Sequence, residues 1–202
     1  MRRLLFAAFV LGWVAIVALV SPAEAGRFNQ VLNTGDAAPD WQGIKGVDGR
    51  EHSLADYRTA KAIVLVFTSN HCPYANSIEG RLIELQKSYG ERGLQVIAVS
   101  VSTYEEDGLE EMKKRSAANG FNFPYLQDAT QKIGRDYGAT CTPHVFLLDG
   151  NRKIAYMGAI DDGDLSKAPA KHYLREAIDA VLNGTQPPRT ETKQRGCTIQ
   201  YE

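Results

Sequence analysis

The chain carries, at residues 62–75, the stretch AIVLVFTSNHCPYA, in which six apolar residues lead through a short polar segment to a cysteine and a proline. A short, continuous apolar run rich in β-branched residues predicts a buried strand over 62–67. Pro73 suits the first turn of a helix, with Cys72 at its beginning. The free N–H groups and the dipole of a helix amino terminus stabilise a thiolate, so we predict that Cys72 is a reactive thiol.

Strands and helices alternate around this stretch. Apolar residues predict a second buried strand over 94–101. Apolar periodicity predicts three longer helices over 73–89, 109–118 and 170–182. Asp149-Gly150-Asn151 separates two apolar runs and predicts a β-hairpin. Parallel strands joined by helices, followed by a hairpin, predict the α/β class with a mixed β-sheet sandwiched by helices.

Residues 1–25 have the pattern of a signal peptide. Two arginines precede an apolar run over 4–20, and Ala23-Glu24-Ala25 supplies the small residues that favour cleavage before Gly26. The apolar run is also close to membrane-spanning length, so an uncleaved membrane anchor is the alternative. Both interpretations predict export, to the periplasm or the extracellular space, and only an uncleaved signal predicts contact with the membrane.

The remaining chain divides into one domain over 26–184 and a polar tail over 185–202. The net charge is −1 and no block of basic residues occurs, so the sequence predicts no nucleic-acid partner. Three cysteines follow the expected cleavage site, and their odd number leaves at least one without an intramolecular partner. In an oxidising compartment this favours a redox role over a structural disulfide framework.

Six segments together resemble the thioredoxin-fold redoxins, in particular the peroxiredoxin-like AhpC/TSA branch with an Asn-His-Cys-Pro segment. They are GDAAPD at 35–40, SLADY at 53–57, NHCPY at 70–74, GATCTP at 138–143, GAIDD at 158–162 and GCTI at 196–199. The resemblance implies a thioredoxin-like fold and an antioxidant oxidoreductase that performs thiol–disulfide exchange or peroxide reduction. It implies no cofactor, because sulfur carries the electrons. The partners that it implies are protein or small-molecule thiols and disulfides, peroxide, and an external thiol reductant.

Carried onto this chain, the resemblance makes Cys72 the nucleophile and matches Thr142-Pro143 to the cis-proline loop that faces it. Ala75 stands where a dithiol motif has its second cysteine, so Cys72 cannot close a local disulfide. Cys141, which directly precedes the cis-proline pair, is the favoured resolving cysteine. Cys197 and an external thiol are the alternatives, and a disulfide between Cys141 and Cys197 is also open.

Two further positions bear on the reaction. His71 adjoins Cys72 and is either a group that tunes the thiolate or a solvated loop histidine. Typical peroxiredoxins have a proline seven residues before the reactive cysteine and a threonine or serine three before it. This chain has Leu65 and Ser69 at these places and so keeps half of that pattern.

A copper- or zinc-binding protein is the rival hypothesis. Thiolate and imidazole ligands suit Cu(I) or Zn²⁺, and the candidate ligands are His71, Cys72, Cys141 and His144. His144 begins a predicted strand, where alternation could turn its side chain away from Cys72. The sequence therefore favours the redox hypothesis over the metal site.

Overall fold

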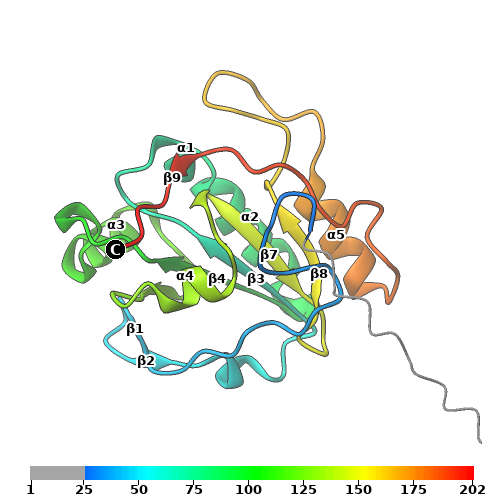
Figure 1. Ribbon diagram of the computed structural model, residues 1–202, viewed down its shortest axis with the longest axis horizontal. Helices are drawn as coiled ribbons and strands as arrows, with labels where there is room; N and C mark the ends of the chain where they lie inside the picture. The colour runs from blue at the N-terminus through cyan, green and yellow to red at the C-terminus, as the bar shows by residue number, and fades with distance from the viewer. Residues whose placement is uncertain (1–25) are drawn as a thin grey trace, which may run out of the picture.

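The computed structural model describes residues 26–202, so the predicted signal peptide over 1–25 lies outside the described residues. A seven-stranded sheet has the order β2-β1-β5-β4-β3-β7-β8 (Figure 1). Its parallel centre consists of β3 (Ala62–Phe67), β4 (Leu94–Ser100) and β5 (Tyr125–Gln127). The antiparallel strands are β1 (Ile44–Gly46), β2 (Glu51–His52), β7 (His144–Leu148) and β8 (Ile154–Gly158).

The helices follow the strands in the predicted order. They are α1 (Pro73–Asn76), α2 (Glu79–Tyr89), α3 (Leu109–Asn119), α4 (Lys132–Asp136) and α5 (Tyr173–Leu182), with 3-10 turns η1 (Leu54–Tyr57), η2 (Gly90–Arg92) and η3 (Glu105–Asp107). Two further short strands, β6 (Cys141–Thr142) and β9 (Cys197–Thr198), form a separate antiparallel pair. The α/β class, the mixed sheet and the hairpin between β7 and β8 are confirmed.

The sheet has a hydrophobic core on each face, because side chains alternate along its central strands. On β3, Val64 and Val66 join the core beneath α2, α3 and α5. Ile63 and Leu65 join the opposite core, which α4 and the loops before β3 cover. All six residues of β3 are buried. This strand is therefore held firmly, and it delivers the Cys72 loop to the end of the sheet.

The predicted helix over 73–89 is interrupted. α1 ends at Asn76, and α2 begins at Glu79 after Ser77 and Ile78. The break leaves Ile78 in the core with its side chain 4 % exposed. Cys72 therefore caps a short separate helix, while α2 packs on the sheet.

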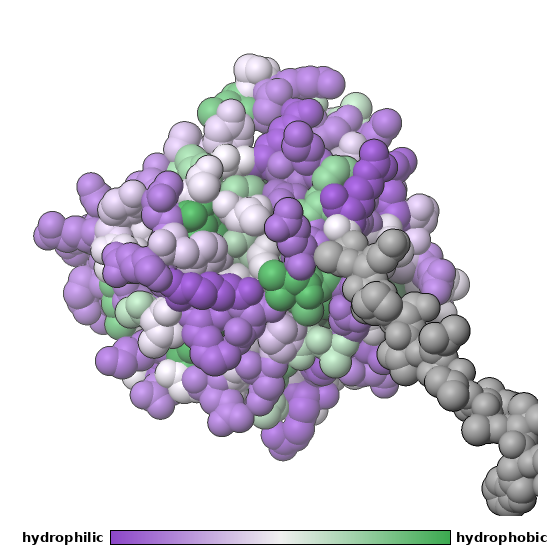
Figure 2. All heavy atoms as spheres, viewed as in Figure 1, coloured by the Kyte–Doolittle hydropathy of each residue, from purple (hydrophilic) through white to green (hydrophobic). Residues whose placement is uncertain are grey.

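The tail over 185–202 runs along the domain and crosses the carboxyl end of the sheet beside α1 (Figure 1). On the face shown in Figure 2, polar side chains predominate and apolar ones are scattered. Within residues 26–202, no helix combines the length and apolar character needed to cross a membrane.

Candidate active site

Cys72 lies between the carboxyl end of β3 and the first turn of α1, as the sequence predicts. Its side chain is fully buried. The thiol lies 2.9 Å from the Thr142 carbonyl oxygen, to which it can donate, and the N–H of Ala75 donates to Sγ over 3.4 Å. The first turn of α1 thus supplies Cys72 with one of the N–H groups that stabilise a thiolate.

Opposing interactions set the pKa of the Cys72 thiol. Burial acts to raise the pKa of the Cys72 thiol, as it does for any desolvated acid. Hydrogen bonds from the Cys197 and Thr142 side chains, and from the N–H groups of Ala75 and Cys197, outweigh burial and lower this pKa below its ordinary value. Two of these four interactions come from the tail.

The cis-proline loop faces Cys72. The Thr142–Pro143 peptide bond is cis, as the resemblance implies. The hydroxyls of Thr142 and Ser69 are 3.2 Å apart, so the Thr142 side chain points toward the loop that carries Cys72. β6 is therefore oriented with one of its faces toward the reactive thiol.

The tail pairs with β6 on that same edge. β9 is antiparallel to β6, with Cys197 opposite Thr142 and Thr198 opposite Cys141. Directly paired residues project to the same face of a two-stranded ribbon, and neighbours along a strand project to opposite faces. Cys197 therefore joins Thr142 on the face toward Cys72, whereas Cys141 lies on the other face.

The environments of the two other cysteines differ accordingly. The thiol of Cys141 is buried and lies 3.6 Å from the carbonyl oxygen of Pro143. Burial, and to a smaller extent the nearby Cys72, raises its pKa to about 12. Burial and the interaction with Cys72 raise the pKa of Cys197 to about 11, and Cys197 is partly exposed. At neutral pH both are thiols, and all three cysteines are free.

A close backbone contact sets the position of Cys197. Gly196 packs directly against the carbonyl group of Thr142, and a methyl group at residue 196 would overlap it. Glycine is the residue that permits such an approach between two backbones. This contact holds the Gly196-Cys197 segment against the cis-proline loop.

The tail is anchored on both sides of Cys197. Before it, Glu191 accepts hydrogen bonds from the N–H groups of residues 27–29, and the Thr192 hydroxyl contacts the Tyr156 hydroxyl over 2.6 Å. After it, the Ile199 N–H donates to the Thr140 carbonyl over 3.0 Å. The Tyr201 hydroxyl and the Glu202 N–H donate to Ala139 and Gln131. The tail therefore lies across the site as a strap, which we define as residues 191–202.

His71 is held by a buried carboxylate. Its Nδ1 bonds to Asp107, whose side chain is fully buried. Asp107 also accepts the N–H groups of Asn70, over 2.5 Å, and of His71, over 3.2 Å. The ring of Tyr104 meets the His71 ring edge-on at 5.0 Å. Asp107 thus fixes the loop that leads to Cys72.

The four residues of the rival metal hypothesis do not form a metal site. Across residues 26–202, no group of three His, Cys, Asp or Glu side chains is arranged to hold a metal ion. His144 pairs with Phe67 inside the sheet, and burial lowers its pKa to about 3. Its Nδ1 has no hydrogen-bond partner among the described residues. His144 is therefore a neutral core residue.

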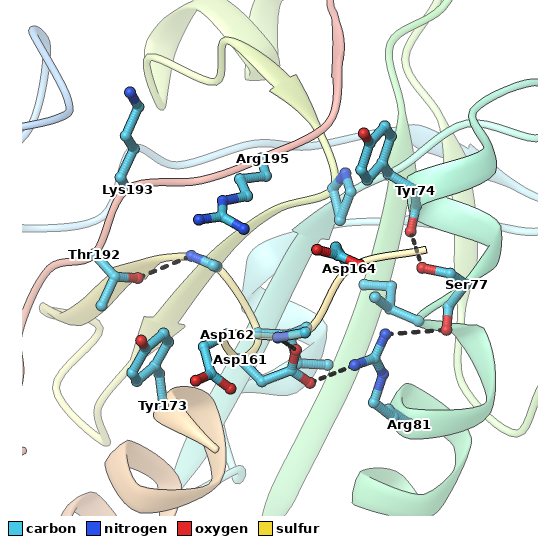
Figure 3. Close-up of a pocket in the computed structure, with 15 residues that line it drawn as sticks. Tyr74, Ser77, Arg81, Asp161, Asp162, Asp164, Tyr173, Thr192, Lys193 and Arg195 are labelled. Carbon is cyan, nitrogen blue, oxygen red and sulfur yellow. Dashed lines mark hydrogen bonds and ion pairs between the residues drawn. The ribbon is translucent and has the colours of Figure 1, made fainter. Parts of the chain in front are cut away.

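A pocket of about 210 Å³ adjoins the reactive loop (Figure 3). Tyr74, Ser77 and Arg81 border it on one side, and the strap residues Thr192, Lys193 and Arg195 border it on the other. Pro143 also lines it. The pocket therefore lies between the helix end that carries Cys72 and the segment that carries Cys197.

Comparison with known proteins identifies the family. A profile of the AhpC/TSA family matches residues 34–157. The chain belongs to the AhpC/TSA family. Thiol-disulfide oxidoreductase ResA of Geobacillus thermodenitrificans is 31% identical over 140 residues, 69% of this chain and 75% of ResA. Peroxiredoxin tpx1 of Schizosaccharomyces pombe is 33% identical over 152 residues, 73% of this chain and 79% of tpx1.

Solved structures extend the comparison to the fold. A hypothetical protein of Sinorhizobium meliloti 1021 is 32% identical, with a TM-score of 0.81 over 86% of this chain and 97% of its own. The thioredoxin domain of a thiol-disulfide oxidoreductase from Bacteroides vulgatus is 23% identical, with a TM-score of 0.53 over 61% of this chain and 86% of its own. This AhpC/TSA protein thus has the thioredoxin-like fold and is an oxidoreductase.

Sequence reasoning missed two features of this AhpC/TSA site. The first is Asp107, which lies in the acidic run Glu105-Glu106-Asp107 just beyond β4. Because β3 and β4 are parallel neighbours, the segments after them meet at one edge, and this adjacency was the available signal. The second is the docking of Gly196 on Thr142, for which the signal was a glycine directly before a cysteine.

Proposed function

We propose that this AhpC/TSA protein is an exported thiol oxidoreductase that cycles between a Cys72/Cys197 dithiol and a Cys72–Cys197 disulfide. The observation that carries the proposal is the pairing of Cys197 with Thr142, whose carbonyl oxygen lies 2.9 Å from the Cys72 thiol. In agreement with this placement, the Cys197 side chain lowers the pKa of Cys72, and burial together with Cys72 raises that of Cys197 to about 11. The sulfur of Cys72 thereby acts as the nucleophile, while Cys197 stays a protonated thiol until it attacks the oxidised Cys72.

In the first half of the cycle, the Cys72 thiolate attacks an electrophile. With hydrogen peroxide, Cys72 becomes a sulfenic acid, the O–O bond breaks, and the second oxygen leaves as water after taking up a proton. With a disulfide, Cys72 forms a mixed disulfide and releases one thiolate. The full burial of Cys72 beneath the strap favours small electrophiles, because a larger one must first displace residues 196–198.

In the second half, Cys197 resolves the oxidised Cys72. Its sulfur attacks the sulfur of Cys72, and the leaving hydroxyl carries away the Cys197 proton as water. From a mixed disulfide, the second thiol of the substrate leaves instead. Two external thiols then reduce the Cys72–Cys197 disulfide. The position of Cys197 opposite Thr142 supports this role, and the Cys141 thiol is directed to the Pro143 carbonyl oxygen instead.

His71 and the cis-proline loop serve as positioning groups in this proposal. The buried Asp107 carboxylate holds the His71 ring and accepts the N–H groups of Asn70 and His71, which lead into Cys72. Thr142 places its hydroxyl and carbonyl at the thiol. Pro143 follows Thr142 and lines the pocket that adjoins the site.

Export belongs to the same proposal and rests on the sequence of residues 1–25. Expression of the full chain with its signal, followed by intact-mass measurement, tests it. We expect a mature protein that begins at Gly26. An unprocessed chain that fractionates with membranes would instead support the anchor, and an unprocessed cytosolic chain would contradict export.

The experiment that tests the reaction compares wild type with Cys72→Ser in two assays, consumption of hydrogen peroxide and reduction of oxidised glutathione, with dithiothreitol as the reductant. We expect Cys72→Ser to abolish whichever activity the wild type has, because a serine hydroxyl is not a nucleophile at neutral pH without a base. Full retention of either activity would refute the role of Cys72. Circular dichroism of the variant verifies that it is folded.

A further inference from the structure

The pocket beside the active site is lined by residues that follow Cys72, by residues that precede Cys197, and by the loop over 159–164. Tyr74 lies two residues after Cys72, and Arg195 lies two residues before Cys197. Its volume of about 210 Å³ is smaller than the ~300–1,000 Å³ of sites for drug-sized ligands. The pocket is therefore suited to part of a small molecule whose remainder extends toward Cys197.

The carboxylates of this pocket are already engaged. Asp161 forms an ion pair with Arg81 over 2.5 Å. Asp162 accepts the N–H groups of residues 170 and 171, and Asp164 accepts those of residues 166 and 167. These main-chain bonds hold the pKa values of Asp162 and Asp164 below their ordinary range. The carboxylates that line the pocket are thus already bonded to other groups of the protein.

The basic side chains of the strap are not engaged in this way. Arg195 and Lys193 form no ion pair with any residue in the 26–202 portion, and Arg195 donates no hydrogen bond there. Arg195 is close enough to Asp164 to contribute to the lowered pKa of that carboxyl. Figure 3 shows the Arg195 guanidinium over the pocket, whereas the Lys193 side chain extends away from it. Arg195 is therefore the available anion-binding group.

We propose that this pocket binds a low-molecular-weight thiol that carries carboxylates, with Arg195 as the recognition residue, and that this thiol reduces the Cys72–Cys197 disulfide. The inference rests on the proposed function and names the class of its reductant. A guanidinium can bind a carboxylate through two parallel hydrogen bonds, which fixes orientation as well as position. The thiol is thereby held next to Cys197.

The chemistry of the pair decides which sulfur is attacked. Cys197 is partly exposed and Cys72 is fully buried, so an incoming thiolate reaches Cys197 first. Cys72 has the lower pKa of the two, and the thiol of lower pKa is the better leaving group. The external thiolate therefore bonds to Cys197 and releases the Cys72 thiolate. A second external thiol attacks the resulting mixed disulfide, frees Cys197 as a thiol and yields the oxidised small molecule.

The test uses purified protein oxidised to the Cys72–Cys197 disulfide and mixed rapidly with one of three reductants. Glutathione carries two carboxylates, its diethyl ester carries none, and cysteamine is a small thiol without a carboxylate. Rates are compared per thiolate present. We expect wild type to react with glutathione about tenfold faster than with the ester, which corresponds to about 1.4 kcal/mol of recognition.

Arg195→Gln removes the proposed recognition group and leaves the strap bonds intact, because Arg195 donates no hydrogen bond within the described chain. We expect it to slow the glutathione reaction about tenfold and to leave the cysteamine reaction unchanged. Lys113→Gln removes an exposed charge from α3 and is the matched control, with unchanged rates expected.

Other results would overturn the inference. Equal wild-type rates with glutathione and its ester would show that carboxylates are not recognised. If Arg195→Gln slowed the reactions with glutathione and with cysteamine equally, Arg195 would position the strap rather than bind the ligand. Failure of the oxidant to form a Cys72–Cys197 disulfide at all would instead contradict the proposed function, so the two failures are distinguishable.

Discussion

The two strands of the small β6–β9 ribbon each carry a cysteine, and these cysteines lie in different environments. On β6, Cys141 is buried, and its thiol lies beside the carbonyl oxygen of Pro143. On β9, Cys197 is partly exposed and pairs with Thr142, whose carbonyl oxygen contacts the Cys72 thiol. Cys141 is the nearer to the cis-proline in sequence, but Cys197 is the one that meets the reactive thiol. In our proposal, the face of the ribbon rather than distance along the chain makes Cys197 the redox partner.

The largest expected difference between the two cysteines is in disulfide formation. One equivalent of hydrogen peroxide or oxidised glutathione, followed by acid quench and non-reducing peptide mapping, should give a Cys72–Cys197 disulfide in wild type and in Cys141→Ser. Cys197→Ser should form none and should stop at a sulfenic acid or a glutathione adduct of Cys72. A Cys72–Cys141 disulfide in wild type would reverse the comparison.

The next effect concerns the docking of the strap. Gly196→Ala places a methyl group against the Thr142 carbonyl. We expect this overlap to destabilise the docked strap by more than ~1.4 kcal/mol, the free energy that changes an equilibrium tenfold. Cys72 of the reduced protein should therefore be alkylated at least about ten times faster. The rate is measured with iodoacetamide and peptide mapping.

Gly80→Ala is the matched control for this substitution. Gly80 lies on α2, and a methyl group added there would meet no other atom within 4 Å, so the alkylation profile of Gly80→Ala should equal that of wild type. Unchanged accessibility of Cys72 in Gly196→Ala would show that this backbone contact does not keep the site closed.

A smaller effect concerns pH. Because hydrogen bonds lower the pKa of Cys72, its thiolate should form below the ~8.5 of a free cysteine, and its alkylation rate should rise with pH through that lowered value. Cys197→Ala removes one of the groups that lower the pKa of Cys72 and should therefore raise this pKa toward the ordinary value of a cysteine. Cys197→Ser keeps a hydroxyl donor and should leave the pKa near the wild-type value.

Thiolate absorbance near 240 nm follows this titration. The other two cysteines do not interfere, because their pKa values are raised to about 11 and about 12. An equal pKa of Cys72 in the Ala and Ser variants would mean that the Cys197 side chain does not stabilise the thiolate.

The smallest expected effect belongs to Cys141. Cys141→Ala should leave turnover with peroxide or disulfide within about twofold of wild type and cost about 1 kcal/mol of unfolding free energy, since it removes a buried sulfur without changing the backbone. Urea unfolding monitored by circular dichroism measures the cost. A loss of turnover larger than tenfold would assign Cys141 a role in the cycle.

Much of the fold could be predicted because its signals are local. The apolar run over 62–67 forms β3, and Asp149-Gly150-Asn151 forms the hairpin turn. The helix over 73–89 is predicted as one element, because periodicity alone does not reveal the break at Ser77 and Ile78. The place of Cys72 is likewise predictable from the strand, cysteine and proline that adjoin in sequence.

The remainder of the site depends on pairings between distant segments. The contact of Cys197 with Cys72 arises from the register of β9 on β6, and a shift of one residue would turn Cys197 to the other face. The burial of Asp107 depends on β4 lying beside β3. Neither register nor strand adjacency leaves a periodic pattern in the sequence, so these residues emerged only from the three-dimensional arrangement.

The two anchors of the strap also set how Cys197 competes with other thiols. Thr192 and Ile199 are both bonded to the domain, and only six residues lie between them. Cys197 therefore meets Cys72 as a tethered group, and a short tether gives an effective concentration of about millimolar or more. Oxidised Cys72 should be captured within its own molecule at a rate independent of protein concentration, so disulfide-linked dimers should stay rare even in concentrated solution.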